Sequence, residues 1–305
     1  MSLTILHTQH ERTFEQNRFV YPVLSRRSEG ISIGVNLNPD KVCNFDCIYC
    51  QVDRTRQSET QFVETEQLLA ELDAVLELAA SGAIFETEKF RDTPLPQRRL
   101  NDIAVSGDGE PTTYKNFDEL IEACAAVKRR HGLEHGTAGQ ASSGTNQVHA
   151  TGVKMVLITN ASMFHRPHVQ RGLRILDANN GEVWAKLEAG TEEYFKLIDR
   201  TPIRLAQIID NISVAARIRP LVIQSLFMRV NGEPPKQAEL EAFCDRLNEI
   251  VTAGGQIKLV QVYTVARKPA ESYVLPLSDA EVDAVVALVR QRTGLAAKAF
   301  YGIQA

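Results

Sequence analysis

The sequence predicts an α/β fold in which helices cover a mostly parallel sheet. Two observations predict it. Short apolar stretches alternate with amphipathic helical stretches along most of the chain, and apolar runs such as Met155-Val-Leu-Ile lack the polar alternation of a half-exposed strand. Strands joined through helices pair in parallel by right-handed crossovers. Six such units are too few for a closed eight-unit barrel, so we expect an open, partly wound barrel or a doubly wound sheet, with the site at the carboxyl ends of the strands.

Each element follows from a local signal. The expected strands are residues 31–37, 102–106, 154–159, 183–187, 221–228 and 257–263. The expected helices are residues 66–80, 116–130, 204–218, 236–251 and 278–292, with a further helix beginning near Pro167. Thr65 is the expected cap of the first helix, and Asn116 with Glu119 and Ser278 with Glu281 form the spacing of a capping box.

Length and composition are those of a globular protein. The chain has 305 residues, 44% hydrophobic and 24% charged, which suits one α/β domain of about 200–250 residues with extensions. We expect an N-terminal extension over residues 1–30, the α/β domain over 31–265, and a C-terminal helical extension packed on it over 266–305. Residues 131–152 are rich in Gly, Ser, Thr and Ala, and we interpret them as a flexible insertion.

The charge balance excludes a strong general attraction to polyanions. There are 34 Lys and Arg against 38 Asp and Glu, a net charge of −4, so nucleic acid would need a local basic patch. The basic pairs available for such a patch include Arg26-Arg27 and Arg54 with Arg56. No apolar run approaches the roughly 18–20 residues of a membrane span, and the first eight residues lack the features of a secretory signal. We therefore expect a cytoplasmic protein that contacts no membrane.

Three of the five cysteines form a cluster. Cys43, Cys47 and Cys50 follow the first expected strand with the spacing Cys-x3-Cys-x2-Cys, whereas Cys124 and Cys244 lie in helical stretches and are interpreted as small buried hydrophobic residues. An odd number of cysteines in a long chain argues against a disulfide framework.

Three thiolates on one tight loop can face a single polynuclear centre. A 4Fe–4S cluster held by three thiolates leaves one iron without a protein ligand, which is then open to a cofactor or substrate. Two alternatives remain at this point. One is a zinc loop completed by Asp46 or a distant histidine, and the other is a set of three unligated thiols.

These features resemble the radical S-adenosylmethionine (radical SAM) enzymes. That superfamily carries the same three-cysteine loop after its first strand, with an aromatic residue before the last cysteine, where this chain has Tyr49. It also carries a Gly-Gly-Glu-Pro-like stretch at the end of the second strand. Here that stretch reads Asp108-Gly-Glu-Pro, with Asp108 in place of the first glycine.

Within the superfamily, the sequence is most similar to the tRNA wyosine synthases and their bacterial iron–sulfur relatives, over roughly residues 21–273. The matching stretches include Tyr21-Pro-Val-Leu-Ser-Arg-Arg, Gly34-Val-Asn-Leu-Asn-Pro, Trp184-Ala-Lys-Leu-Glu-Ala-Gly and Tyr263-Thr-Val-Ala-Arg. The chain has no cysteine before Cys43, so it lacks the additional N-terminal cysteines that wyosine synthases use for a second cluster.

The resemblance implies a fold, cofactors and a partner. It implies a partial (β/α)6 barrel in which Cys43, Cys47 and Cys50 hold a 4Fe–4S cluster and S-adenosylmethionine binds the open iron. An external one-electron reductant, of the flavodoxin or ferredoxin type, would reduce the cluster. Cleavage of S-adenosylmethionine would then give a 5′-deoxyadenosyl radical that abstracts hydrogen from a substrate, for which a tRNA base is one candidate.

The resemblance and the strand ends also suggest residues that bind S-adenosylmethionine. They are Tyr49, Gly107, Gly109, Glu110, Pro111, Thr159, Asn160, Lys186 and Glu188. Alternatives for some of them are core packing for Tyr49, turn formation for Thr159 and Asn160, and a buried structural ion pair for Lys186 and Glu188.

A second set of residues is expected to contact substrate, and no catalytic residue is assigned. This set is Gln224, Arg229, Gln261 and Tyr263. The alternative function, from a different class, is a non-catalytic nucleic-acid-binding module stabilised by zinc or an iron–sulfur cluster.

Overall fold

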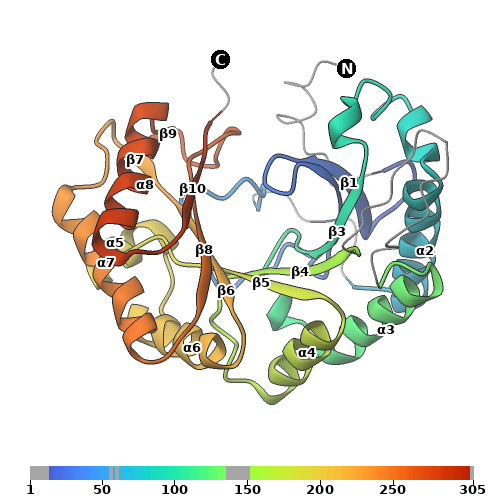
Figure 1. The fold of residues 1–305 in the computed structure, drawn as a ribbon, viewed down its shortest axis with the longest axis horizontal. Coiled ribbons are helices and arrows are strands. Elements are labelled where there is room, and N and C mark those ends of the chain that lie inside the picture. The colour runs from blue at the N-terminus through green and yellow to red at the C-terminus, as the bar shows by residue number, and fades with distance from the viewer. Residues whose placement is uncertain (1–13, 55–57, 59–61, 135–151, 303–305) are drawn as a thin grey trace. The chain divides into compact units, whose positions relative to one another are not determined.

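The computed structural model describes residues 14–54, 58, 62–134 and 152–302. The chain forms two compact units, each assembled from separate stretches of sequence. The first unit comprises Met1–Val42, Gln57–Leu157 and Pro167–Glu182, and the second comprises Cys43–Arg56, Ile158–Arg166 and Val183–Ala305. Each contains parallel strands with helices packed against them (Figure 1). Most of the expected insertion, residues 135–151, lies outside the described residues.

The sheet of the first unit has the strand order β1–β2–β3–β4. These strands are β1 (Val20–Ser25), β2 (Gly30–Val35), β3 (Leu100–Val105) and β4 (Lys154–Thr159). β2, β3 and β4 pair in parallel, as expected, and β2 is buried along its whole length. β1 pairs with β2 in antiparallel orientation, with Val20 opposite Val35. The sequence analysis placed this stretch in an extension and missed the strand.

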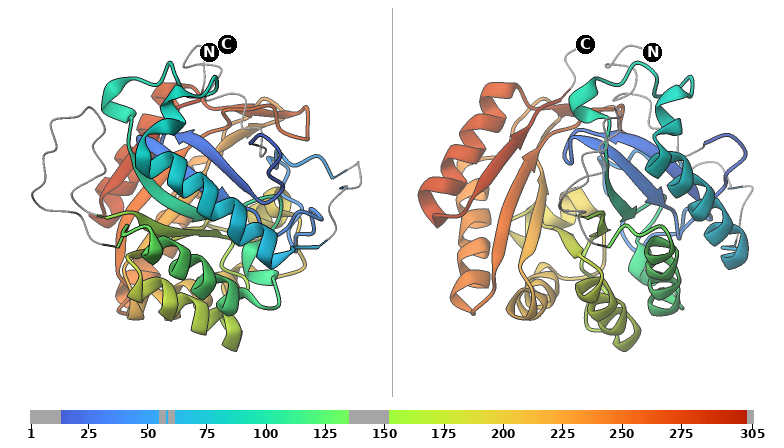
Figure 2. Two further views of the ribbon diagram at one scale, coloured as in Figure 1. Left: turned by 90° about the vertical axis from the view of Figure 1, so that its right-hand side faces the viewer. Right: turned by 45° about the vertical axis from the view of Figure 1, so that its right-hand side comes forward.

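Three helices form a layer on this sheet (Figure 2). They are α2 (Thr65–Ser81), α3 (Phe117–Arg130) and α4 (Pro167–Ala178), accompanied by the short 3-10 turns η1 (Ala83–Glu86), η2 (Leu95–Gln97) and η3 (Pro111–Thr113). The apolar stripe of α2 is buried as its spacing predicts. One expected cap is wrong, because Glu64 precedes α2 and Thr65 is its first residue. Asn116 occupies the N-cap position of α3 as expected, but its side chain donates to the Glu119 carboxylate and does not cap the backbone, so the capping box is not formed.

The sheet of the second unit has the order β5–β6–β8–β10, with all neighbours parallel. Its strands are β5 (Gly181–Lys186), β6 (Leu221–Leu226), β8 (Ile257–Tyr263) and β10 (Ala297–Phe300). A separate antiparallel pair is formed by β7 (Met228–Val230) and β9 (Val274–Pro276). The expected C-terminal extension therefore contains strand β10 of the sheet in addition to a helix.

The helices of the second unit are α5 (Glu192–Asp199), α6 (Leu205–Ile218), α7 (Gln237–Thr252) and α8 (Asp279–Thr293). The capping box of Ser278 and Glu281 at the start of α8 is confirmed. α5 was not expected, and its N-cap Thr191 accepts a hydrogen bond from the backbone of Tyr194. Among the described residues, no helix combines the length and the apolar character that crossing a bilayer requires.

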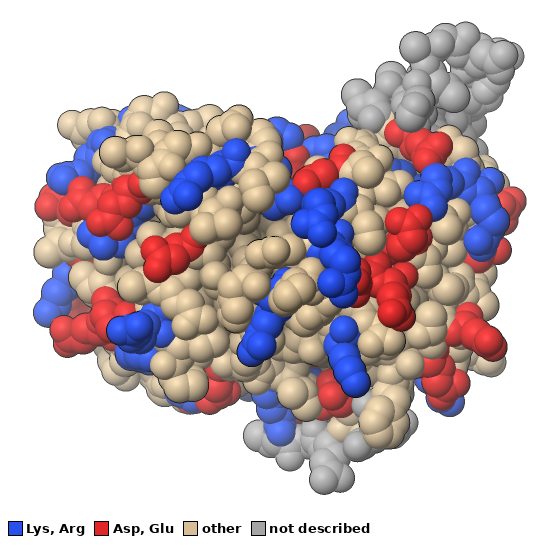
Figure 3. Space-filling view, turned by 90° about the horizontal axis from the view of Figure 1, so that it is seen from below, with Lys and Arg blue, Asp and Glu red and all other residues tan. Residues whose placement is uncertain are grey.

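Charges of both signs are mixed on the surface. Figure 3 shows one face on which lysine and arginine side chains alternate with aspartate and glutamate side chains over short distances. Of the basic pairs noted in the sequence, Arg54 is described and Arg56 lies outside the described residues.

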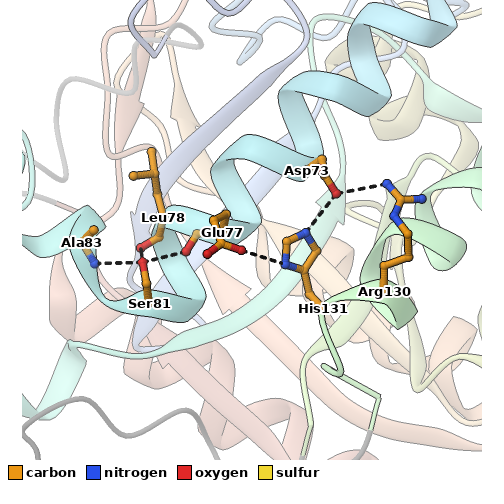
Figure 4. Close-up of polar contacts among 7 residues, drawn as sticks. All are labelled: Asp73, Glu77, Leu78, Ser81, Ala83, Arg130 and His131. Carbon is orange, nitrogen blue, oxygen red and sulfur yellow. Dashed lines mark hydrogen bonds and ion pairs between the residues drawn. The ribbon is translucent and has the colours of Figure 1, made fainter.

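His131 departs from the expected solvated insertion. It directly follows α3, its side chain is 12% exposed, and it lies between two carboxylates of α2 (Figure 4). Its Nε2 lies 3.0 Å from the Asp73 carboxylate and its Nδ1 3.5 Å from the Glu77 carboxylate. Arg130 also bonds to Asp73, at 3.0 Å. The insertion is therefore anchored at its first residue.

Candidate metal centre

The three clustered cysteines lie on one loop of the second unit, residues 43–54, which we call the cysteine loop. All three are partly exposed cysteines outside any disulfide bond. Arg54 at the end of the loop bonds to Cys50 and interacts electrostatically with Cys43 and Cys47. Within the described part of the chain, no three His, Cys, Asp or Glu side chains form a group suited to a single metal ion. Three cysteines on one loop match the donor set of a 4Fe–4S cluster with one open iron, whereas a structural zinc site needs four protein ligands.

Backbone hydrogen bonds fix the shape of the cysteine loop. The N–H of Asp46 donates to the carbonyl of Asp199 at 3.2 Å, and the N–H of Ile48 donates to the carbonyl of Ile198 at 2.9 Å. The carbonyl of Cys50 accepts from the N–H of Ala270 at 2.9 Å. The end of α5 and the segment after β8 therefore hold the loop at two places without using the sulfur atoms.

A buried amide network anchors the first part of the loop. The Nδ2 of Asn44 donates to the Ser162 hydroxyl at 2.7 Å, and Asn160 donates to the Asn44 Oδ1 at 2.9 Å. Asn211 on α6 donates to the backbone carbonyl of Ser162. The hydroxyl of Thr159 accepts from the N–H of Ala161 at 3.0 Å. Thr159 and Asn160, expected to bind S-adenosylmethionine, thus shape the turn after β4 and support the cysteine loop.

Tyr49 connects the loop to two buried carboxyl groups. The side chain is 5% exposed, and its hydroxyl donates to Glu188 at 2.7 Å and lies 3.4 Å from the Asp199 carboxylate. Asp199 also accepts a hydrogen bond from the Cys47 thiol at 3.2 Å. The ammonium of Lys186 lies over the Tyr49 ring, 5.4 Å from its centroid. Lys186 and Glu188, expected on one face of their strand, therefore meet at the same tyrosine.

Burial governs the protonation of this group. Burial raises the pKa of Glu188 and of Asp199, and for Glu188 the neighbouring Asp199 carboxyl adds to the effect. Burial also raises the pKa of the Cys47 thiol, and Asp199 reinforces it. Burial lowers the pKa of Lys186, but Tyr263 and Glu188 outweigh it and the net direction is upward. The site thus holds a cation beside carboxyl groups that resist ionisation.

A polar row runs across the sheet of the second unit. Lys186, Gln224, Gln261 and Lys298 are aligned in register on β5, β6, β8 and β10, so they share one face. Gln224 donates to the Oε1 of Gln261 at 2.9 Å, and its own Oε1 is buried without a hydrogen-bond partner. Either assignment of the Gln224 amide leaves one of its polar atoms unpartnered. Arg229, expected to contact substrate, instead bonds to Glu281 of α8 at 2.5 Å.

The Gly107–Pro111 stretch belongs to the first unit and forms a tight turn after β3. A side chain on Gly107 would collide with Asn36, and one on Gly109 with the carbonyl of Val42, so only glycine fits at either position. The buried Glu110 carboxylate accepts hydrogen bonds from the backbone N–H and the hydroxyl of Thr112, and so caps η3.

The sequence analysis missed three residues that the structure brings to the cysteine loop. Asp199 contacts Cys47 although it is 152 positions away in sequence, and no local signal marks it. Asn44 lies between Cys43 and Cys47 in the sequence and anchors the loop. Arg54 was noted only as part of a basic pair, yet its Nη1 lies 2.9 Å from the Cys50 sulfur. Its position four residues after the last cysteine was the available signal.

Known structures share this architecture. The structure of Streptococcus suis SuiB bound to S-adenosylmethionine matches at 13% identity and a TM-score of 0.55, covering 90% of this chain and 52% of SuiB. A radical SAM methyltransferase from Sphaerobacter thermophilus matches at 13% identity and a TM-score of 0.60, covering 95% and 71%. TYW1 with a lysine-pyruvate adduct matches at 14% identity, covering 87% and 74%, with a TM-score of 0.48. The first two matches define an α/β protein of the partial (β/α)6-barrel class, as the sequence predicts.

The family follows from the sequence comparison. The model of the radical SAM superfamily matches residues 37–238, and the chain belongs to this superfamily. Enzymes of the superfamily use a 4Fe–4S cluster and S-adenosylmethionine, so these two predicted cofactors are confirmed. Enzymes of the superfamily also need an external reductant, and the flavodoxin or ferredoxin type stays a prediction.

Two curated relatives are longer than this chain. The chain is 25% identical over 236 residues to a UPF0026 protein of Helicobacter pylori (strain J99), covering 76% of this chain and 62% of that protein. It is 26% identical over 182 residues to a protein named GTPase Obg of Brachyspira hyodysenteriae, covering 59% of this chain and 20% of that protein. The chain thus covers less than two thirds of the length of each.

Proposed function

We propose that this radical SAM enzyme holds one 4Fe–4S cluster on Cys43, Cys47 and Cys50 and cleaves S-adenosylmethionine reductively for hydrogen abstraction from a substrate. The observation that carries the proposal is a preformed loop that offers three thiols and no fourth. The remaining cysteines, Cys124 and Cys244, are buried in α3 and α7. When bound, the cluster and S-adenosylmethionine supply a 5′-deoxyadenosyl radical.

The residues of the second unit would orient these groups. Asp199 and Glu188 fix the Tyr49 ring through its hydroxyl, and the ring in turn holds the loop between Cys47 and Cys50. Lys186 supplies a half-buried positive charge that suits the carboxylate of an amino acid. Tyr49 keeps its ring beside this cation, and Thr159 and Asn160 keep the turn after β4 in place.

For the first unit, the proposal rests on the motif. Gly107, Gly109, Glu110 and Pro111 would present backbone donors and acceptors to the methionine part of S-adenosylmethionine, since a zwitterion needs both. The side chain of Glu110 is occupied by the cap of η3, so we assign the recognition to the backbone of this turn.

Anaerobic reconstitution tests the cluster. The wild-type chain should take up about four irons and, with reductant, release 5′-deoxyadenosine from S-adenosylmethionine. Cys47→Ala should lose the cluster, whereas Cys244→Ala, a buried cysteine of the same unit, should retain it. A chain that binds a single zinc ion and never cleaves S-adenosylmethionine would overturn the proposal and favour the zinc-stabilised module.

The substrate proposal is a tRNA base, supported by the sequence resemblance to the wyosine synthases. Mass spectrometry of RNA that copurifies with the chain tests it, and an oligonucleotide carrying a base altered in mass after turnover would support it. Turnover of a small molecule with no RNA bound would replace this substrate and leave the radical chemistry intact.

A further inference from the structure

Arg54 places a fixed positive charge against one of the three ligand sulfurs. It leaves the cysteine loop four residues after Cys50 and turns back, so that its Nη1 donates to the Cys50 sulfur at 2.9 Å. The side chain is half-buried. A guanidinium is charged at every accessible pH, so this N–H···S bond carries a full positive charge.

The three ligand positions therefore lie in unequal fields. Cys50 has the Arg54 cation as its hydrogen-bond partner, whereas Cys47 has the carboxyl of Asp199. The Arg54 guanidinium therefore places its positive charge at the Cys50 sulfur.

We propose, on the basis of the function proposed above, that Arg54 raises the reduction potential of the cluster through its hydrogen bond to the Cys50 sulfur. One electron from the external reductant adds one negative charge to the cluster, and no bond is made or broken. A cation at the ligand sulfur stabilises the reduced state more than the oxidised state, because the reduced cluster carries more negative charge. Hydrogen bonds to the sulfurs are among the features that set such potentials.

Arg54 is not needed to shape the loop backbone. The loop is held by the hydrogen bonds from Asp46 and Ile48 to the end of α5, and by the bond from Ala270 to the Cys50 carbonyl. None of these involves the arginine side chain. Removing the guanidinium should therefore change the field at the cluster while leaving the three cysteines in place.

The test is a redox titration, followed by electron paramagnetic resonance, of anaerobically reconstituted wild-type chain, Arg54→Gln and Arg54→Lys. Arg174→Gln, which removes an exposed arginine of α4, is the matched control. All four should take up the same amount of iron. Arg54→Gln should lower the equilibrium constant for one-electron reduction at least tenfold, a fall of about 59 mV. Arg54→Lys should give a smaller fall, and Arg174→Gln none.

Each outcome decides the proposal. Iron-loaded Arg54→Gln with the wild-type potential overturns it. If Arg54→Gln takes up no iron, Arg54→Lys decides, and a wild-type potential in that variant overturns the hydrogen-bond role. If neither variant takes up iron while Arg174→Gln does, Arg54 serves cluster assembly and the tuning role is wrong. Wild-type chain that binds no cluster would contradict the proposed function instead.

Discussion

Two clusters of side chains in this molecule each contain an aspartate and a glutamate, but one cluster is exposed to water and the other is buried. In the first unit, Asp73 and Glu77 of α2 flank His131 at the surface (Figure 4). In the second, Glu188 and Asp199 flank the Tyr49 hydroxyl and are almost wholly buried. The Asp73 side chain is 48% exposed, so water and mobile ions screen its contacts.

The two groups shift pKa in opposite directions. Hydrogen bonds from His131 and Arg130 lower the pKa of Asp73, whereas burial raises the pKa of Glu188 and Asp199. Removal from water, more than the identity of the neighbours, decides the sign. A buried group of this kind opposes folding and is offset by the rest of the structure. Strongly shifted titratable groups beside a cysteine loop are therefore where chemistry is expected.

The largest expected effect comes from breaking the buried group. Glu188→Leu removes the acceptor of the Tyr49 hydroxyl and a polar neighbour of the Lys186 ammonium, and should lower the free energy of unfolding by about 3–5 kcal/mol. Glu188→Gln keeps an acceptor and should lose less. Urea denaturation measures both. A loss below 1 kcal/mol in the leucine variant would show that the buried Glu188 stabilises the fold no more than the exposed Asp73 does.

A buried carboxyl of the first unit tests whether burial itself is the cause. Burial raises the pKa of Asp102 to about 6, although the Ser32 hydroxyl donates to it. Between the unfolded pKa of about 3.9 and 6, the folded chain keeps a proton that the unfolded chain has lost, so stability falls as pH rises, by up to about 3 kcal/mol. Asp102→Asn should remove this fall in denaturation curves recorded from pH 4 to 7. An unchanged pH profile would contradict the role of burial.

The glutamine pair tests whether polar residues of the second sheet serve stability. Replacing both Gln224 and Gln261 by methionine removes a buried amide with an unpartnered atom, and should raise the free energy of unfolding by about 1 kcal/mol. Gln224→Met alone leaves the Gln261 Oε1 without its hydrogen-bond donor and should not raise the free energy of unfolding. If the double variant is destabilised, the pair is a structural hydrogen bond.

The smallest effect on stability is expected at the surface, where Asp73 contacts His131 and Arg130. Asp73→Asn should lower the free energy of unfolding at pH 7 by less than about 1 kcal/mol. The pKa of Asp73 is lowered, so its contribution is present above the unfolded pKa and disappears as pH falls through the folded value. The difference between Asp73→Asn and wild type should also shrink in 1 M salt. A loss of several kcal/mol that does not depend on salt would show that solvent exposure does not explain the difference in stability contribution between the Asp73 cluster and the Glu188 cluster.

Local chemistry made much of the fold predictable. β4 and β8 have the predicted bounds because their apolar runs are unbroken, and the capping box of Ser278 defines the start of α8. β1 was missed because a short stretch containing Pro22 resembles a loop until β2 pairs with it. α5 was missed because eight residues give little periodicity.

The site was predictable only where it is local in sequence. The spacing of Cys43, Cys47 and Cys50 marks them in the sequence, and Lys186 and Glu188 stand out because they are charged residues at the end of an apolar stretch. Asp199 reaches Cys47 only through the tertiary fold, and no pattern in one sequence encodes that contact. Glu110 stands at a position of the family motif, yet its carboxylate accepts a hydrogen bond from Thr112, two residues further along the chain.

The anchoring of the cysteine loop has a consequence for how the protein withstands exposure to oxygen. Iron–sulfur centres are lost when oxygen attacks them, and a protein folded around its metal collapses with it. Here the loop is tied by main-chain bonds to Ile198, Asp199 and Ala270 that owe nothing to iron. A protein that has lost its cluster should therefore keep the conformation of the cysteine loop. It should then bind a new cluster without refolding, so that the existing chain can be repaired and need not be synthesised again.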